Sequence, residues 1–351
     1  MFPHPSSSSV LAFCRPGMES DCAAELVARC AALEVGAWCR VRDGLVELTV
    51  PEAADLATLG AGIRFPTLVF ARQWLTIVAR PDTLPERDRA TPIAAAAAAV
   101  LDTCSGVRVE HPDTDAGRPL ARLARRLEGP VTIALERAGI AFRPEAPVLH
   151  VVLLDGTAAI VGLSAAGNSA PWPMGIPRLK APRAAPSRSV LKLEEALTLF
   201  LSDDERASWL RPGRRAVDLG AAPGGWTWLL AERGLTVDAV DNGRLAASLE
   251  ENTRVSHHRA DGFRFRPRGP VDWLVCDMVE QPHRIAALAA GWLERGDCRH
   301  AVVNLKLPMK QRWRTVVRHL ETIAAALPPD GRVAAKQLYH DRAEVTVFAT
   351  R

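Results

Sequence analysis

The feature that most constrains this chain is a short apolar segment running directly into a glycine-rich turn. Residues 215–219 read Arg-Ala-Val-Asp-Leu, and Gly-Ala-Ala-Pro-Gly-Gly follows at 220–225, just before Trp226. An apolar strand, a tight turn and a helix in this order predict the first half of a doubly wound nucleotide-binding site. Glycines in such a turn allow the backbone to approach a ligand closely.

The residues of this turn also restrict which ligand it suits. The turn is neither a G-x-G-x-x-G dinucleotide motif nor a P-loop, and it contains no lysine to hold a phosphate. The predicted strand ends instead in Asp218, whose carboxylate repels a pyrophosphate. An acid at this position suits a ligand that carries positive charge, such as the methionine moiety of S-adenosylmethionine.

From residue 190 onward, segments with helix and strand patterns alternate regularly. The expected helices cover 191–200, 284–293 and 313–327, and the expected strands cover 236–240, 271–276, 301–305, 332–337 and 344–349. This alternation predicts an α/β fold with a mostly parallel, doubly wound sheet, covered by helices on both faces and closed by an antiparallel pair. Ligands of such sheets bind beyond the carboxyl ends of the strands. Four charged residues fall at these ends: Asp218, Asp241, Asp277 and Lys306.

Two further acids occupy positions that suit a nucleoside. Asp241 lies about 20 residues beyond the glycine turn, where an acid accepts hydrogen bonds from ribose hydroxyls. That placement fits NAD as well as S-adenosylmethionine. Asp261 follows a third short strand, and we expect it to accept a hydrogen bond from the adenine amino group. The competing interpretation of Asp241 is a surface carboxylate, and that of Asp261 is an acid that caps a helix or turn.

Residues 1–165 mix strands and helices without a nucleotide-binding turn, which predicts an α+β arrangement. We expect an N-cap at Thr91, because Pro92 follows it and an alanine-rich helix comes next. We expect a hairpin around Asp155-Gly156. The expected strands are 10–14, 44–50, 68–79, 107–110, 149–154 and 158–163, and the expected helices are 19–33, 91–104 and 118–127.

Residues 165–189 are rich in proline and glycine, which excludes a long helix and indicates an interdomain linker. The segment contains four cations and no acidic residue: Arg178, Lys180, Arg183 and Arg188. A solvated linker and a strip that contacts phosphates are both open interpretations. Further cations follow Lys306, among them Lys310 and Arg312.

The remaining composition excludes several classes of protein. The net charge of +4 permits a polyanionic partner without requiring one. The seven cysteines form no C-x-x-C pair and the histidines show no ligand spacing, so we expect buried thiols and no metal. Residues 1–6 do not resemble a signal peptide, and no uncharged apolar run is long enough for a membrane span. These features predict a cytoplasmic protein without a membrane partner.

Several segments of the C-terminal half together resemble one enzyme family. Residues 187–195, 218–226 and 304–308, with Asp277, are similar to the FtsJ family of RNA ribose 2′-O-methyltransferases. The Lys-Asp-Lys-Glu tetrad of that family falls on Lys192, Asp277, Lys306 and Glu344. A second set of segments resembles more closely the members that methylate a cytidine ribose in the peptidyl-transferase region of 23S rRNA. These segments are 171–180, 240–243, 276–280, 305–310 and 338–341.

The resemblance implies a domain organisation, a cofactor and a partner. It implies a ferredoxin-like unit over 1–60, a THUMP-type RNA-binding domain over 61–165, a linker over 166–188 and a Rossmann-like methyltransferase domain over 189–351. The implied cofactor is S-adenosylmethionine, and the implied partner is 23S rRNA or an assembling large-subunit precursor. The expected cofactor-binding residues are Ser189, Asp218, Gly220, Ala222, Pro223, Gly224, Gly225, Trp226, Asp241, Asp261 and Asp277. Ala222 departs from close members of the family, which carry cysteine there, but backbone contacts are expected to survive.

The same resemblance suggests roles for the tetrad and for the cations. Lys306 is expected to accept the proton of the ribose 2′-hydroxyl, because the nearby charge of Lys192 disfavours a second ammonium, although Asp277 and Glu344 act in the opposite direction. In the alternative, Lys306 stays charged and orients the oxygen while water takes the proton. The residues expected to contact RNA are Arg178, Lys180, Arg183, Arg188, Lys310 and Arg312.

Three other functions compete with this hypothesis. A small-molecule methyltransferase would not need the lysine-containing tetrad or a basic N-terminal half. An RNA-binding protein that has lost catalysis would usually have lost the tetrad or the glycine turn, and both are intact here. A nicotinamide oxidoreductase is disfavoured by Asp218 before the turn.

Overall fold

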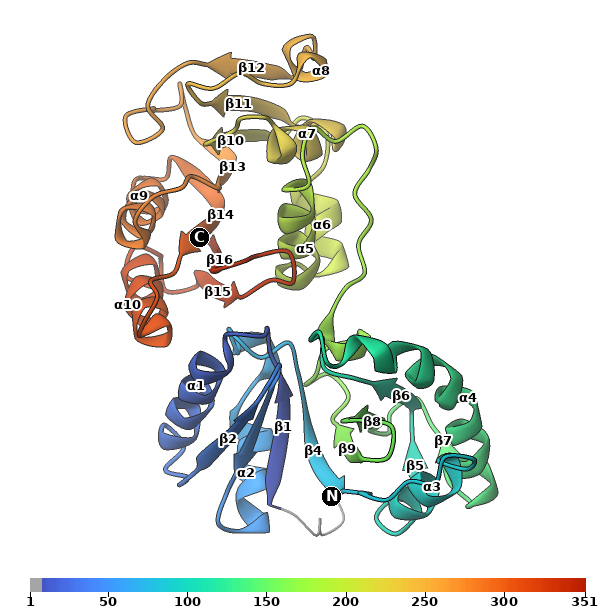
Figure 1. Ribbon diagram of the computed structural model, residues 1–351. Coiled ribbons are helices and arrows are strands. Elements are labelled where there is room, and N and C mark those ends of the chain that lie inside the picture. The colour runs from blue at the N-terminus through green and yellow to red at the C-terminus, as the bar shows by residue number, and fades with distance from the viewer. Residues whose placement is uncertain (1–7) are drawn as a thin grey trace. The chain divides into compact units, whose positions relative to one another are not determined.

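A computed structural model describes residues 8–351 of the chain (Figure 1). The described residues divide into two compact units, the first ending at Pro177 and the second comprising Arg178–Arg351. Each unit contains its own seven-stranded sheet. Within residues 8–351, no helix combines the length and the apolar character that crossing a membrane requires. The prediction about a signal peptide concerns residues 1–6, which lie outside the described part.

The first unit is built on a sheet with the strand order β2-β3-β1-β4-β9-β8-β6, and β5 pairs with β7 separately. Its strands are β1 (Ser9–Phe13), β2 (Trp38–Arg42), β3 (Leu45–Thr49), β4 (Gln73–Ala79), β5 (Thr103–Cys104), β6 (Gly106–Glu110), β7 (Ala141–Phe142), β8 (Val148–Leu153) and β9 (Ala159–Ser164). Its helices are α1 (Glu19–Ala31), α2 (Ala53–Gly62), α3 (Ala90–Ala98) and α4 (Ala121–Arg137), with short 3₁₀ turns η1 (Phe65–Thr67), η2 (Arg118–Leu120) and η3 (Pro173–Gly175).

The elements β1 to β4 follow the β-α-β-β-α-β order of a ferredoxin-like unit. Strand β4 pairs with β1 on one side and with β9 on the other, so a single sheet continues into the remainder of the unit. The predicted boundary at residue 60 precedes this fourth strand. The division of the first half into a ferredoxin-like unit and a THUMP domain therefore stays a prediction.

Several predicted elements of the first unit need correction. Thr91 is not an N-cap: helix α3 already begins at Ala90, and the backbone N–H of Thr91 donates to the Asp88 side chain at 3.1 Å. The helix ends at Ala98, and residues 103–104 form β5 instead of continuing it. The strand expected over 68–79 begins only at Gln73.

The late start of strand β4 has a visible physical cause. The backbone N–H groups of Val69 and Phe70 donate to the buried carboxylate of Glu25, at 2.6 and 2.8 Å, and not to a neighbouring strand. The predicted hairpin is confirmed as β8 and β9, and the Asp155 carboxylate accepts hydrogen bonds from the N–H groups of Thr157 and Ala158. Strand β2 was not predicted. It is an edge strand whose residues are mostly exposed, so it has no buried face that alternates with an exposed one.

The second unit confirms the predicted α/β class. Its sheet has the order β12-β11-β10-β13-β14-β16-β15, in which β16 runs antiparallel to both of its neighbours. The strands are β10 (Arg215–Leu219), β11 (Thr236–Val240), β12 (Val255–His258), β13 (Val271–Cys276), β14 (Cys298–Lys306), β15 (Arg332–Lys336) and β16 (Glu344–Thr350). The helices are α5 (Val190–Phe200), α6 (Asp203–Trp209), α7 (Gly225–Glu232), α8 (Ala247–Glu250), α9 (Pro282–Arg295) and α10 (Arg312–Ala324).

The core of this unit forms where α5 and α7 pack on the sheet. Leu193, Leu197, Leu230 and Trp273 are almost completely buried in one apolar cluster. Helix α6 was not predicted, although Ser202 and Glu205 form a capping box at its start. The parallel strands β10, β11, β13 and β14 end along the same edge of the sheet, which is the edge where the sequence places its charged residues.

We expect Leu230→Ala to destabilise the second unit by about 2–5 kcal/mol, because Leu230 is fully buried and its truncation leaves a cavity. The measurement is urea unfolding followed by tryptophan fluorescence. Val279→Ala is the control, since Val279 is 89% exposed and should change the free energy of unfolding by less than about 0.5 kcal/mol. Equal effects of the two substitutions would contradict the packing described here.

Candidate active site

The glycines of the turn occupy positions where a side chain would not fit. Gly220 and Gly224 have positive φ angles of +79° and +112°, which residues with a Cβ rarely adopt. A Cβ on Gly220 would meet the Met278 side chain at 2.6 Å, and a Cβ on Gly225 would meet the Ser189 hydroxyl at 2.3 Å. The turn thus keeps an open backbone surface beside β13 and the start of α5.

A pocket of about 270 Å³ lies over this turn. The Trp226 indole N–H donates to the Ser189 carbonyl at 2.9 Å, which ties the start of α7 to the residue before α5. The pocket gathers most of the residues that the sequence assigned to the cofactor. Its lining residues are Ser187, Ser189, Asp218, Gly220, Ala221, Ala222, Pro223, Trp226 and Asp277.

Asp218 is the next-to-last residue of β10, whose bounds are those that the sequence predicted. Its side chain is 1% exposed and accepts a hydrogen bond from the Thr227 hydroxyl at 2.6 Å. Burial raises the pKa of Asp218 to about 7, and the nearby charge of Asp277 adds to that shift even though the Thr227 hydrogen bond opposes it. Asp218 therefore changes its charge near neutral pH.

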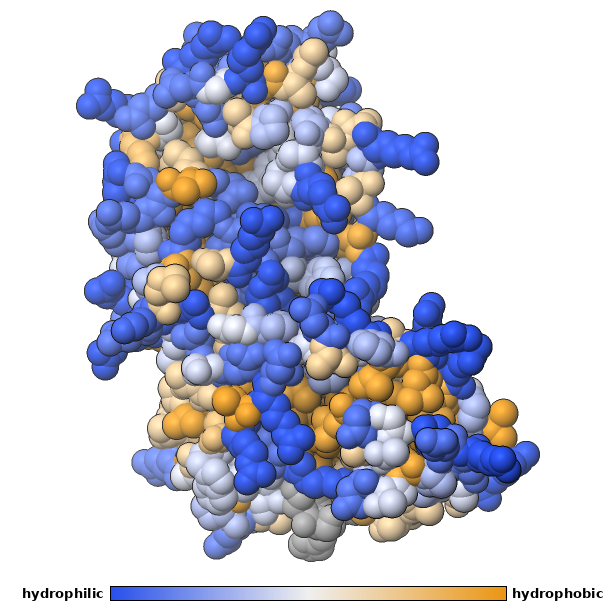
Figure 2. All heavy atoms as spheres, viewed as in Figure 1, coloured by the Kyte–Doolittle hydropathy of each residue, from blue (hydrophilic) through white to orange (hydrophobic). Residues whose placement is uncertain are grey.

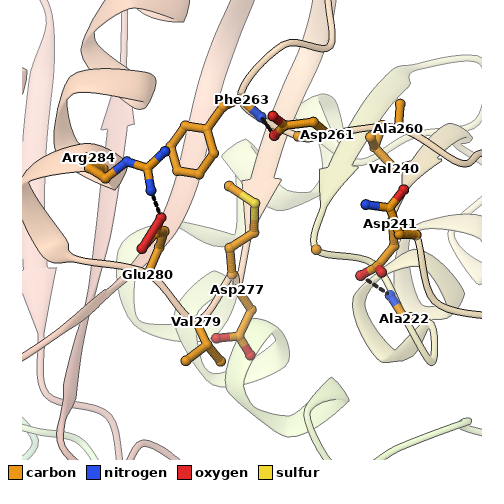
Figure 3. Close-up of a pocket in the computed structure, with 14 residues that line it drawn as sticks. Ala222, Val240, Asp241, Ala260, Asp261, Phe263, Asp277, Val279, Glu280 and Arg284 are labelled. Atoms are coloured by element: carbon orange, nitrogen blue, oxygen red, sulfur yellow. Dashed lines mark hydrogen bonds and ion pairs between the residues drawn. The ribbon is translucent and has the colours of Figure 1, made fainter.

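A larger cleft of about 620 Å³ opens beyond the ends of β11, β12 and β13 (Figure 3). The Asp241 carboxylate lines it and accepts the backbone N–H groups of Ala222 and Gly243, at 3.1 and 2.7 Å. Asp261 also lines it and accepts the N–H of Phe263 at 2.9 Å.

The cleft is also lined by Phe263, Glu280 and Arg284, to which the sequence assigned no contact with the cofactor. The Arg284 guanidinium lies 4.1 Å from the centroid of the Phe263 ring and forms an ion pair with Glu280 (Figure 3). A cation over an aromatic face is attracted to its π-electrons. Glu280 and Arg284 are four residues apart, whereas Phe263 comes from the loop after β12, so the contact of Arg284 with the ring depends on the tertiary structure.

The four residues of the predicted tetrad come together in the structure. Lys192, on α5, contacts Glu344 and lies 3.4 Å from Asp277 Oδ2. Lys306, at the end of β14, contacts the other oxygen of Glu344 and lies 3.3 Å from Asp277 Oδ1. Lys306 and Glu344 are also direct partners in the β14–β16 register, which fixes their distance through the backbone.

The charges of this cluster are strongly coupled. Burial alone would raise the pKa of Glu344, but the hydrogen bonds and positive charges of Lys192 and Lys306 hold it below its usual value. Burial alone would lower the pKa of Lys192, but Asp277 and Glu344 raise it above its usual value. The ion pairs thus outweigh the desolvation of both groups, and Glu344 and Lys192 are charged at neutral pH.

The sequence did not assign a role to several buried polar residues around the tetrad. Asn304 donates to Asp277 Oδ1 at 2.8 Å, and Thr346 lies beside Asn304 on β16. Asp341 and Glu195 are buried carboxyls near the same strands. Asn304 precedes Lys306 by two residues and Thr346 follows Glu344 by two, so the period of a strand would have placed them on the tetrad's face.

The cations predicted to contact RNA are at the surface of the second unit. Arg178, Lys180, Arg183, Arg188 and Lys310 are exposed, whereas Arg312 is half-buried. Figure 2 shows hydrophilic side chains projecting from much of the visible face of this unit.

Within residues 8–351, no group of three or more histidine, cysteine or acidic side chains is placed to hold a metal ion. The cysteines carry free thiols, and burial raises the pKa of Cys276 to about 12. Cys276 is therefore a poor nucleophile.

Comparison with known proteins agrees with this geometry. The FtsJ-like methyltransferase model matches residues 185–318. The RlmM ferredoxin-like domain matches 7–75, and the N-terminal model of ribosomal RNA large subunit methyltransferase M matches 88–165. The fold and the site together define an FtsJ-like methyltransferase that depends on S-adenosylmethionine. A turn whose three glycines leave no room for a Cβ, together with the acids that line the cleft, fits a cofactor with a cationic end and a nucleoside.

Sequence identity over almost the full chain shows which family of these methyltransferases it belongs to. It is 47% identical to ribosomal RNA large subunit methyltransferase M of Xanthomonas oryzae pv. oryzae, over 98% of this chain and 99% of the relative. It is also 47% identical to the protein of that name from Edwardsiella ictaluri, over 97% of this chain and 93% of the relative. The chain belongs to the ribosomal RNA large subunit methyltransferase M family and is an RNA methyltransferase. The crystal structure of TrmN from Thermus thermophilus covers 98% of this chain and 99% of its own, with 20% identity and a TM-score of 0.36, a likeness too weak to support an argument.

We expect Glu344→Gln to lower the free energy of unfolding at neutral pH by about 3 kcal/mol, since it leaves two lysines without their shared partner. A lowered folded-state pKa stabilises the fold above the unfolded value near 4.5, and this contribution is lost as the pH falls through the folded pKa. The difference between wild type and variant should therefore shrink below about pH 4.5. Denaturant unfolding between pH 3 and 8 measures it, with the exposed Glu321→Gln as control; a difference independent of pH would contradict the charge assignment.

Proposed function

We propose that the chain methylates the ribose 2′-hydroxyl of a cytidine in 23S rRNA, with Lys306 as proton acceptor. The substrate is the free rRNA or an assembling large-subunit precursor. One observation carries the proposal: both lysines of the tetrad contact both of its acids, at the edge of the sheet where the parallel strands end. The high pKa of the buried Cys276 argues against the alternative of thiolate-assisted methylation of a pyrimidine carbon.

In this proposal the pocket and the cleft hold the cofactor. When bound, S-adenosylmethionine supplies a methyl group that its sulfonium has already activated. Asp218 faces the cationic end, Asp241 accepts hydrogen bonds from the ribose, and Asp261 accepts one from the adenine amino group. The other assigned cofactor residues, which contribute backbone or close packing, are Ser189, Gly220, Ala222, Pro223, Gly224, Gly225, Trp226 and Asp277.

The environment of the two lysines supports different roles for them. Lys192 is the more buried lysine, and its raised pKa keeps it charged. Lys306, which ends β14 and keeps 28% of its side chain exposed, is the lysine that we assign as acceptor of the proton from the ribose hydroxyl. Asp277 and Glu344 stabilise the ammonium that results. Proton transfer of this kind contributes typically about 10²–10⁴-fold to the rate, and alignment of the reacting atoms contributes more.

The proposal includes the RNA contacts and the first unit. Arg178, Lys180, Arg183, Arg188, Lys310 and Arg312 contact phosphates of the rRNA, which positions the strand without reading its sequence. The first unit serves as an RNA-binding module of the THUMP type. The cytoplasmic location rests on the rRNA substrate and is part of the same proposal.

The first test is methyl transfer from labelled S-adenosylmethionine to 23S rRNA that lacks the modification. We expect wild type to yield labelled 2′-O-methylcytidine and Lys306→Ala to lose at least about 10²-fold in kcat, with cofactor affinity unchanged. Lys310→Ala is the matched variant, because it should raise the KM for rRNA and leave kcat nearly intact. Label in a base carbon or nitrogen, or full activity of Lys306→Ala, would refute the assignment.

A second test uses the titration of Asp218. Its folded pKa of about 7 means that the free protein carries a protonated Asp218 at acid pH, whereas a cationic ligand favours the ionised form. Cofactor affinity should therefore rise with pH, by at most about tenfold per unit, up to pH 7 and then level off. Titration calorimetry between pH 5.5 and 8.5 should show this rise in wild type and in the exposed Asp203→Asn control, but not in Asp218→Asn. The same rise in Asp218→Asn would exclude Asp218 as its source.

A further inference from the structure

The loop between β15 and β16 contains a buried acid that the proposed function does not use. Asp341 is 1% exposed and is not part of the tetrad. Its carboxyl accepts the backbone N–H of Leu338 at 3.0 Å and lies 3.1 Å from the Thr346 hydroxyl. A buried carboxyl is costly unless its hydrogen bonds are satisfied, so its contacts indicate what it does.

A continuous hydrogen-bond chain connects Asp341 to the tetrad. The Thr346 hydroxyl lies 2.6 Å from Asn304 Oδ1, and Asn304 Nδ2 lies 2.8 Å from Asp277 Oδ1. Asn304 and Thr346 are cross-strand partners on β14 and β16, and both are completely buried. The backbone register therefore holds these groups in contact.

The orientation of the Asn304 amide sets the direction of the hydrogen bonds in this chain. Its nitrogen donates to Asp277 Oδ1, and Asp277 also contacts two lysines. The amide oxygen of Asn304 then faces Thr346, whose hydroxyl must donate to it. The Thr346 hydroxyl lies 2.6 Å from Asn304 Oδ1 but 3.1 and 3.4 Å from the two Asp341 oxygens. Its single proton belongs to the shortest contact, so a hydrogen bond between Thr346 and Asp341 requires Asp341 as the donor.

We propose that Asp341 is protonated and that it acts through Thr346 and Asn304 to position the Asp277 carboxylate for Lys306. Asp341 is thus a positioning residue, and this role rests on the function proposed above. Asn304 and Lys306 share Asp277 Oδ1, while Lys192 approaches Oδ2. The chain thereby fixes the rotation of the carboxylate between the two lysines.

The surroundings of Asp341 agree with a neutral acid. Burial, with the negative charge of Glu344 adding to it, raises the pKa of Asp341 well above its usual range. The charged groups that face it are Glu344 from β16 and both Glu195 and Lys192 from α5, of which only Lys192 favours ionisation. The two acids outnumber the one cation, and solvent does not reach the carboxyl.

The activity test uses variants that remove or keep one donor. Thr346→Val cannot donate to Asn304 and should lower kcat for methyl transfer about tenfold, with the KM for S-adenosylmethionine unchanged. Thr346→Ser should restore kcat. Thr350→Val is the matched control, because Thr350 lies on the same strand with its hydroxyl bonded to His300, away from the tetrad. A loss in Thr350→Val equal to that in Thr346→Val, or no rescue by serine, would overturn the proposal.

Two variants of Asp341 test whether its role is to donate a hydrogen bond or to supply a negative charge. Asp341→Asn retains a donor toward Thr346 and an acceptor for the Leu338 N–H, so it should keep most of kcat. Asp341→Ala should lose about as much kcat as Thr346→Val. Thermal unfolding and cofactor binding of each variant show whether a loss reflects misfolding. If a folded Asp341→Asn lost as much kcat as Asp341→Ala, the hydrogen-bond chain would need an ionised carboxylate, which would refute the proposal.

The proton itself can be observed without any methyl transfer, so this test is independent of the proposed function. The infrared difference spectrum between wild type and Asp341→Asn at pH 7 should contain the carbonyl stretch of a protonated carboxylic acid. The same band should persist when both proteins carry Lys306→Ala. Only carboxylate bands in the difference spectrum would refute a protonated Asp341, whether or not the chain methylates rRNA.

Discussion

The sharing of one buried carboxylate by two lysines is the interaction around which the second unit is arranged. Glu344, with 5% of its side chain exposed, accepts from Lys192 on α5 and from Lys306 on β14. A buried ion pair is tolerated only with good geometry and satisfied partners. Helix α5 must therefore pack against β16 in one register, and the antiparallel pairing of β14 and β16 must place Lys306 opposite Glu344.

The acids around this cluster differ in charge because their neighbours differ. Glu344 lies against two lysines, which hold its pKa low, whereas burial raises the pKa of Asp218 and of Asp341, and nearby acids add to both shifts. The site thus combines a carboxyl whose pKa is lowered with two carboxyls whose pKa is raised. Groups whose pKa values are separated in this way are the usual means by which one site both binds charge and moves protons.

The first unit also contains a hydrogen-bonded set of residue types that other proteins use in catalysis, but here the set is enclosed. His150 contacts Glu110 at 2.6 Å and Ser164 at 2.9 Å, the combination that serine hydrolases use. All three are at most 2% exposed, and the second Glu110 oxygen accepts the backbone N–H of Met174. No substrate reaches a serine enclosed in this way, so the set anchors residues 173–175 against the sheet. Accessibility distinguishes it from the tetrad, which borders an open cleft.

The sequence by itself determined the alternation of strands and helices from residue 190, the hairpin at Asp155 and the glycine turn, because local spacing and turn chemistry encode them. It also placed Asp277 and Lys306 at strand ends, and the family resemblance supplied Lys192 and Glu344. Only the tertiary structure decided which oxygen of Asp277 meets which lysine, that Asp218 is buried inside β10, and that Asn304, Thr346 and Asp341 form one relay. Those contacts join β13, β14, β16 and α5, and a hydrogen bond between distant segments depends on register and packing, which no local pattern specifies.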